Sequence, residues 1–237
     1  KKILLLPILV IISFTSVKAQ EVKSGLMVVG TIHGAHNMNP NYSYDSLYNF
    51  IEKYNPDIIG VEIRKEDMDS SVAYLKRNYP FEMYDCISRY PEKVVLGFDW
   101  LGDDIAGKAI PSNYWKEISS VKKLEQQLFT DTVMLKKLAV IEIVRDEKIR
   151  MVLHSSLEQL NDMRYDLINR IYYKQLELML KDTKYAPLTD FYKKRDEMIA
   201  ENILEIVKNN PGKKIIFLLG IDHRDLTATR LKNLINN

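Results

Sequence analysis

Four polar residues close apolar segments that lie far apart in the sequence, and their types suit hydrolysis. His33 ends "VVGTIH", Glu62 lies in "IIGVEIR", Asp99 follows "LGF", and His223 ends "GIDH". Two histidines and a carboxylate form a known catalytic metal set that leaves one position open for water. Without a metal, a histidine can act as general base while a carboxylate fixes its tautomer. Both routes end in hydrolysis.

Four short segments rich in β-branched and large apolar residues are predicted to be buried strands. They are residues 26–32, 57–63, 93–98 and 214–219. Residues 41–56 and 65–80 separate the first three, and both carry apolar residues at helical spacing. This alternation predicts an α/β fold, with a parallel-rich central sheet built from βαβ units and flanked by helices.

Such a sheet would gather the four polar residues, because the carboxyl ends of parallel strands lie along one edge and ligands bind there. Glu62 lies between Val61 and Ile63 in an otherwise apolar strand. A buried carboxylate needs a cation, a metal or several hydrogen-bond donors. Gly30 and Gly220 precede the two histidines, and glycine permits a sharp turn or a close approach to a ligand.

Two further segments contain residues that could bind a ligand. His36 lies three residues after His33, in a loop predicted to be flexible and solvated, and is a second-choice ligand. Residues 102–109 match a phosphate-binding loop except at Ala109, where a Ser or Thr hydroxyl would hold Mg²⁺. Asp103 and Asp104 would repel a phosphate, so we do not expect nucleotide binding.

Residues 20–237 are predicted to form a single domain, with a long helical insertion at about 110–187. Residues 114–208 contain long stretches with helical periodicity and few helix breakers. We expect this insertion to form a wall or lid over the site. Cys86 is the only cysteine, which excludes an internal disulfide and favours a small buried residue.

The N-terminus predicts export. Residues 1–19 contain a basic start, a short apolar segment and a small-residue cleavage site, which are typical of a signal peptide removed after Ala19. We therefore expect a periplasmic or secreted protein with no stable membrane span after signal removal. Without these residues the chain has 31 basic and 32 acidic residues, so its charge gives no support to a nucleic-acid partner. A small molecule or a peptide is the expected substrate, and the sequence predicts no particular oligomeric state.

The chain resembles the TraB/GumN and Tiki-like proteins, together with the related erythromycin-esterase and ChaN-like haem-uptake proteins. The resemblance rests on "VVGTIHGAH", "PDIIGVEIR" and "KKIIFLLGIDH", and on "KKRDEMIAENI" as an arginine-bearing helix before the last strand. It covers roughly residues 26–66 and 188–225. Ile221-Asp222 departs from the small residues of the Tiki-like branch, while "GFDW" looks closer to the esterase and ChaN-like branches.

The resemblance implies a site between the two Gly-x-x-His motifs. His33, Glu62 and His223 would hold a divalent metal (Mn, Co or Zn) or activate water. Arg195 would stabilise an anion and Asn202 would share its helix face, while Asp99 would be a further ligand or orienting group. The function it favours is metal-dependent hydrolysis of the peptidase or esterase type.

The same resemblance leaves three alternatives open. One is a metal-independent, esterase-like hydrolase. The second is a haem- or ligand-binding protein of the ChaN-like type without catalysis, for which Tyr42 and Tyr44 could offer an axial phenolate. The third is a regulatory member that retains only the fold.

Overall fold

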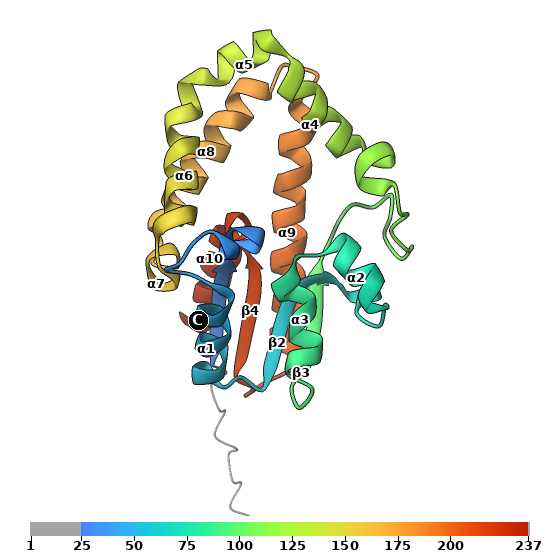
Figure 1. Cartoon of the computed structure of the whole chain (residues 1–237), viewed down its shortest axis with the longest axis vertical. Coiled ribbons are helices and arrows are strands. Elements are labelled where there is room, and N and C mark those ends of the chain that lie inside the picture. Colours follow the sequence, from blue (N-terminus) through green and yellow to red (C-terminus); the bar gives the residue numbers. More distant parts are fainter. Residues whose placement is uncertain (1–24, 237) are drawn as a thin grey trace, which may run out of the picture.

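The centre of the molecule is a four-stranded parallel sheet in the order β1-β4-β2-β3 (Figure 1). This computed structural model describes residues 25–236, so the predicted signal peptide lies outside the described residues. The strands are β1 (Leu26–Thr31), β2 (Ile58–Arg64), β3 (Val94–Asp99) and β4 (Ile215–Gly220). The predicted α/β class is confirmed, and each strand lies within one residue of its predicted bounds.

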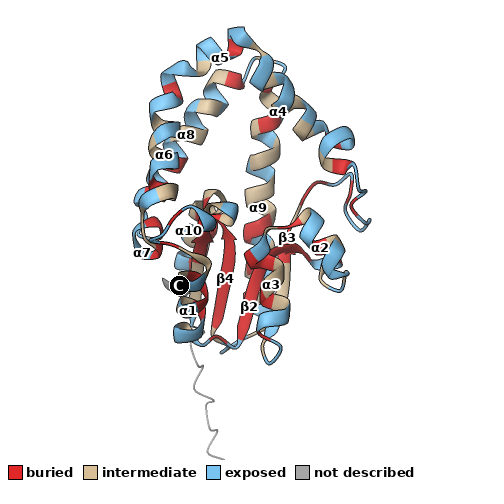
Figure 2. Ribbon diagram, viewed as in Figure 1, coloured by how far each residue is buried: buried red, intermediate tan, exposed pale blue. Residues whose placement is uncertain are grey.

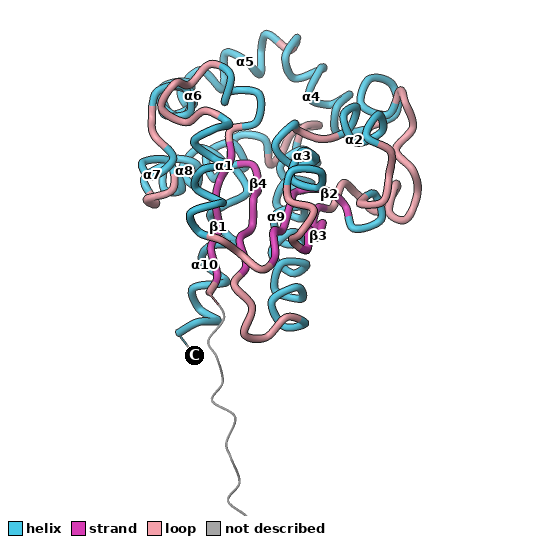
Figure 3. Tube along the Cα trace, turned by 60° about the horizontal axis from the view of Figure 1, so that its bottom comes forward, coloured by secondary structure: helices cyan, strands magenta, loops and turns pink. Residues whose placement is uncertain are grey.

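Helices cover both faces of the sheet, as Figure 3 shows. The first face packs against α1 (Tyr44–Tyr54), α2 (Val72–Asn78) and α3 (Phe81–Arg89), whose apolar side chains share a core with those of β1, β2 and β4. Cys86 is buried in this core, as predicted. The second face packs against α9 (Ala186–Asn209) and α10 (Arg224–Asn236). Helix α3 had no counterpart in the sequence prediction.

The helical segment between β3 and α9 rises as an arch beyond the carboxyl edge of the sheet, and much of its surface is exposed (Figure 2). It comprises the π-helix η3 (Tyr114–Ile118), α4 (Ser120–Thr130), α5 (Thr132–Leu138), α6 (Glu142–His154), α7 (Leu157–Leu160) and α8 (Arg164–Leu180). Ser119 and Asp131 cap α4 and α5 by accepting backbone N–H bonds. The amino-terminal half of α9 completes the arch. No helix in residues 25–236 combines the length and the apolar character needed to cross a bilayer.

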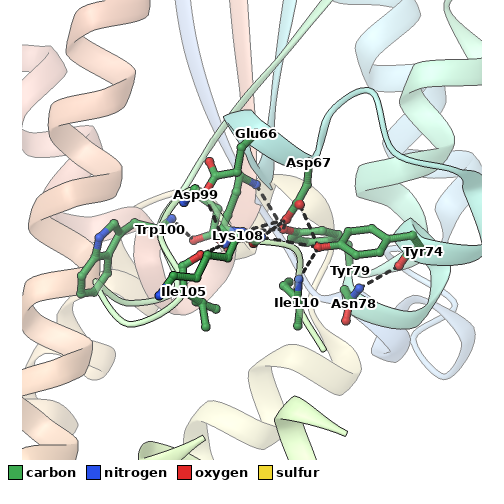
Figure 4. Close-up of polar contacts among 12 residues, drawn as sticks. Glu66, Asp67, Tyr74, Asn78, Tyr79, Asp99, Trp100, Ile105, Lys108 and Ile110 are labelled. Atoms are coloured by element: carbon green, nitrogen blue, oxygen red, sulfur yellow. Dashed lines mark hydrogen bonds and ion pairs between the residues drawn. The ribbon is translucent and has the colours of Figure 1, made fainter. Parts of the chain in front are cut away.

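A buried cation fixes the loop that follows β3. Arg64 ends β2 and pairs with Asp67, and its Nη1 and Nη2 donate to the carbonyl oxygens of Ile105 (2.7 Å) and Lys108 (2.9 Å). Asp67 also accepts from the hydroxyl groups of Tyr74 (2.8 Å) and Tyr79. Figure 4 shows Asp67, Tyr74, Tyr79, Ile105 and Lys108 gathered in this network. The loop that resembles a phosphate-binding loop is thus held by its own carbonyl groups.

The packing of the sheet predicts which glycine can accept a methyl group. A Cβ atom on Gly60 would lie 2.4 Å from Cδ1 of the buried Phe217, whereas one on Gly34 would meet nothing within 4 Å. We expect Gly60→Ala to lower the free energy of unfolding by about 1–3 kcal/mol through overpacking. Gly34→Ala should change it by less than about 0.5 kcal/mol. Urea unfolding of both variants checks this, and equal stabilities would contradict the packing described.

Candidate functional site

Five elements deliver polar side chains to the carboxyl edge of the sheet. His33 follows β1 in the 3-10 helix η1 (His33–Asn37), and its φ of 50° lies in the left-handed region that residues other than glycine rarely adopt. Glu62 lies near the end of β2 and Asp99 ends β3. His223 follows β4 in η5 (Ile221–His223), and Arg195 comes from the middle of α9. The predicted meeting of these side chains is therefore present in the structure.

Arg195 joins the two buried carboxylates of this edge. Its Nη2 donates to Glu62 Oε1 at 2.7 Å, and its Nε and Nη2 donate to the two Asp99 oxygens at 3.0 Å each. The second oxygen of Glu62 accepts the backbone N–H of Gly220. The cation that a buried Glu62 requires is thus Arg195, held in a bidentate pair with Asp99.

Each histidine is bound by a carboxylate of its own. Nδ1 of His33 lies 2.8 Å from Oε1 of Glu82, which also accepts the Thr31 hydroxyl at 3.0 Å. Nδ1 of His223 lies 2.5 Å from Oδ1 of Asp196. A carboxylate at Nδ1 favours the tautomer that carries its proton there, which leaves Nε2 free to accept one. The site therefore contains two oriented imidazole bases.

The free ring nitrogen of His223 faces Glu62, and that of His33 lies against Gly220. Nε2 of His223 lies 3.8 Å from Glu62 Oε1. A Cβ atom on Gly220 would lie 2.6 Å from His33 Nε2 and 3.3 Å from Glu62 Oε2, so only glycine permits this approach. On Gly30 a Cβ would instead meet Ile221 at 2.1 Å, so that glycine serves packing beside the site.

Burial and charge change the protonation of these groups. Burial alone would lower the pKa of His33, but the hydrogen bond to Glu82 and the charge of Glu62 outweigh it and raise the pKa. Burial and Arg195 oppose protonation of His223, yet Glu62 and Asp196 raise its pKa as well. Burial would raise the pKa of Glu62, but His223 and Arg195 hold it below its usual value. Burial raises the pKa of Asp99 despite Arg195.

A cavity of about 250 Å³ opens onto these groups, and His33, Glu62, Asp99, Arg195 and His223 all line it. Aromatic residues from the arch, among them Trp115 and Tyr192, form its outer wall. A second hollow, of about 300 Å³, reaches His223 and Asp196 from the side of α8. A concave site with a few converging polar groups is typical of a small-molecule site.

Asn202 and His36, both predicted to support the site, lie outside the cavity wall. Asn202 donates its side-chain N–H to the carbonyl oxygen of Phe98 at 2.9 Å and so fastens α9 to β3. The expectation of a solvated His36 is wrong, because this side chain is buried. Its Nδ1 lies 2.7 Å from the carbonyl oxygen of Tyr42, and its Nε2 accepts the N–H of Ile32 at 3.3 Å. Both nitrogens are used to shape the turn after β1.

Asp222 anchors the arch beside His223. Its carboxylate accepts the hydroxyl groups of Tyr165 (2.6 Å) and Tyr173 (3.0 Å) and an N–H of Lys148 (3.2 Å). These partners lie on α6 and α8. The carboxylate therefore points away from the cavity and holds the histidine motif against the arch.

Sequence reasoning missed Glu82 and Asp196, the carboxylates that orient the histidines. Asp196 directly follows Arg195 in "YKKRDE", a segment that looks like a solvated helix face. Glu82 lies in the first turn of α3, in "PFEMYD", where an acidic residue is ordinarily explained by the helix dipole. The one usable signal in the sequence was that Asp196 directly follows Arg195, a residue already predicted to belong to the site.

The three predicted metal ligands line one cavity, where Glu62 already has other partners. Both oxygens of Glu62 are bound, one by Arg195 and one by the Gly220 amide. Within residues 25–236, no three His, Cys, Asp or Glu side chains are grouped so as to hold a metal ion. A metal at His33, Glu62 and His223 stays a prediction from the sequence, and no step below depends on it.

Comparisons with protein-family models, with characterised proteins and with solved structures find no match to this chain. The resemblance to the TraB/GumN and Tiki-like proteins therefore stays a prediction, and the site has to be interpreted from its own geometry.

The pairing of His33 with Glu82 predicts a measurable titration. Because the carboxylate of Glu82 raises the pKa of His33, Glu82→Gln should lower that pKa. The His33 ring protons, followed by NMR from pH 5 to 9, report it. Asp85→Asn is the control, since Asp85 lies one turn further along α3 and bonds Arg89 instead. An unchanged His33 pKa in Glu82→Gln would contradict the pairing.

Proposed function

We propose that this protein hydrolyses a carboxylic ester or a related acyl bond, with two histidines as acid–base catalysts and no required metal. One observation carries the proposal: two imidazoles, each fixed by a carboxylate at Nδ1, flank an arginine-bound glutamate inside a cavity. Paired titratable groups in one cavity are the usual arrangement for general acid–base catalysis.

We assign the base to His33, because 39% of its side chain is exposed and it therefore meets water most readily. Its Nε2 takes a proton from a water molecule, whose oxygen attacks the carbonyl carbon of the ester. Arg195 uses Nε and Nη2 for its carboxylate partners, so Nη1 is the donor for the oxyanion that forms.

The tetrahedral intermediate breaks down when protonated His223 gives its proton to the leaving alcohol. The products are a carboxylic acid and an alcohol, so one water is consumed and all protons are accounted for. His33 is then protonated and His223 neutral. Proton exchange through solvent, with Glu62 beside both rings, restores the starting state.

The charges of the site favour protonation of the imidazoles, on which the roles of His33 as base and His223 as acid depend. Glu62, Glu82, Asp99 and Asp196 face a single guanidinium, so an added proton is attracted to the imidazoles. The raised pKa values of both histidines agree with this balance. An acid–base pair requires that one imidazole is protonated while the other is neutral.

The haem alternative receives no support from its two tyrosines. The Tyr42 hydroxyl is buried and donates to the carbonyl oxygen of Gly30 at 2.9 Å. The Tyr44 hydroxyl donates to the carbonyl oxygen of His33 at 3.2 Å. Neither belongs to the described residues that line the cavity.

The test is hydrolysis of ethyl acetate, followed by NMR of the released ethanol, by protein treated with a chelator and shown by elemental analysis to be free of metal. An alkyl ester is required because its alkoxide, unlike p-nitrophenolate, leaves only when it receives a proton. We expect His33→Ala and His223→Ala each to lower kcat/KM by about 10²–10⁴-fold. His154→Ala, an exposed histidine on α6, should leave it unchanged.

Two outcomes would contradict the proposal. Turnover that is lost with the metal and restored by Mn²⁺, Co²⁺ or Zn²⁺ would establish the metallohydrolase instead. Turnover that persists in both cavity-histidine variants would show that the ester is cleaved elsewhere.

A further inference from the structure

The arch contains an apolar groove of about 340 Å³ that the proposed hydrolysis does not use. Its wall includes Leu135 and Leu138 of α5, Leu176 and Leu180 of α8, Leu188 of α9, and Ile141. Leu180 and Leu188 are buried in the small core at the top of the arch, while Leu135 remains 36% exposed. The groove is thus open on one side and built on packed helices.

Helix α9 connects this groove to the reacting groups. Leu188, Tyr192 and Arg195 are spaced by four and three residues, so they share one face of the helix. Leu188 lies in the groove and Arg195 in the catalytic cavity, separated by about 10 Å along the helix axis. Tyr192 lines both spaces and is their common wall.

A polar bridge marks the boundary between the two spaces. The Tyr192 hydroxyl donates to Glu125 of α4, and Lys122 donates to the other oxygen of Glu125 at 2.7 Å. Lys122 lines the catalytic cavity and Glu125 lines the groove. The reacting groups therefore lie on one side of the bridge. On the other side lies a mostly apolar wall, whose charged members are Glu125, Glu142 and Arg145.

We propose that this groove binds an apolar arm of the substrate, so that the site acts on esters whose hydrocarbon or aromatic group extends about 10 Å from the scissile carbonyl. The assignment rests on the hydrolytic function proposed above. Apolar surface beside a reacting centre supplies binding energy to a substrate without changing its chemistry. Ligand sites in proteins combine such apolar walls with a few orienting polar groups.

A groove variant with a matched control tests the assignment. Leu135→Glu places a charge in the groove, and Leu135→Trp fills it without adding charge. Val133→Glu places the same charge on the same helix at a position that is 75% exposed and outside the groove wall. Circular dichroism confirms that each variant folds.

Two measurements are made on each protein. The first is the affinity for N-phenyl-1-naphthylamine, an uncharged aromatic probe that fluoresces in apolar surroundings. The second is the ratio of kcat/KM for p-nitrophenyl octanoate to that for p-nitrophenyl acetate. Both quantities should fall at least about tenfold in the two Leu135 variants and change less than twofold in Val133→Glu.

The outcomes separate the two proposals. If neither ester is hydrolysed, the proposed function fails, while the probe still reports whether the groove binds apolar ligands. No probe binding to the wild type, or equal losses in Leu135→Glu and Val133→Glu, would overturn the groove assignment. So would a dimer, seen by analytical ultracentrifugation, that Leu135→Glu dissociates, because a second copy would then cover the groove.

Discussion

The structure depends on the burial of one carboxylate at the edge of the sheet. Glu62 is almost inaccessible near the end of a central strand, and Arg195 is its charged partner at 2.7 Å. Removing one member of a buried ion pair typically costs about 3–5 kcal/mol, so the partner must be held firmly. This explains why a 24-residue helix crosses the sheet edge and why Asn202 fastens it to β3. The amino-terminal half of α9, which precedes Arg195 in the chain, forms one side of the arch.

The position of α9 also determines which charged groups surround the two histidines. Arg195 neutralises Glu62 and Asp99, while the adjacent Asp196 orients His223. The strand order places the two histidine-bearing strands, β1 and β4, side by side, followed by the strands of Glu62 and Asp99. His33 and His223 thus line one cavity with separate carboxylate partners. The charge of Glu62 raises the pKa of both. The proposed acid–base pair rests on this arrangement of the two histidines around one carboxylate.

The sequence was informative where the chain is apolar and periodic, and less so where function depends on distant partners. The four strands and the convergence of His33, Glu62, Asp99 and His223 followed from short apolar runs and from the geometry of parallel sheets. Glu82 could not be found in this way, because its role depends on how α3 is placed beside the turn after β1. His36 was misjudged for a related reason: its burial comes from Tyr42 and the backbone of its own turn, which hydropathy does not reveal. The groove of the arch arises from helix packing, which periodicity alone does not specify.

The central claim is that two separately bound imidazoles act as base and acid. The pH dependence of kcat/KM for ethyl acetate, whose leaving alcohol must receive a proton, tests it most directly. The account predicts a bell-shaped profile. Glu82 and Asp196 both raise the pKa of the histidine they bind. Glu82→Gln should therefore move the acidic limb to lower pH, because His33 then loses its proton more easily. Asp196→Asn should move the basic limb to lower pH, because His223 then stays protonated over a narrower range. A profile that neither substitution shifts, or one in which a single substitution moves both limbs equally, would contradict the account.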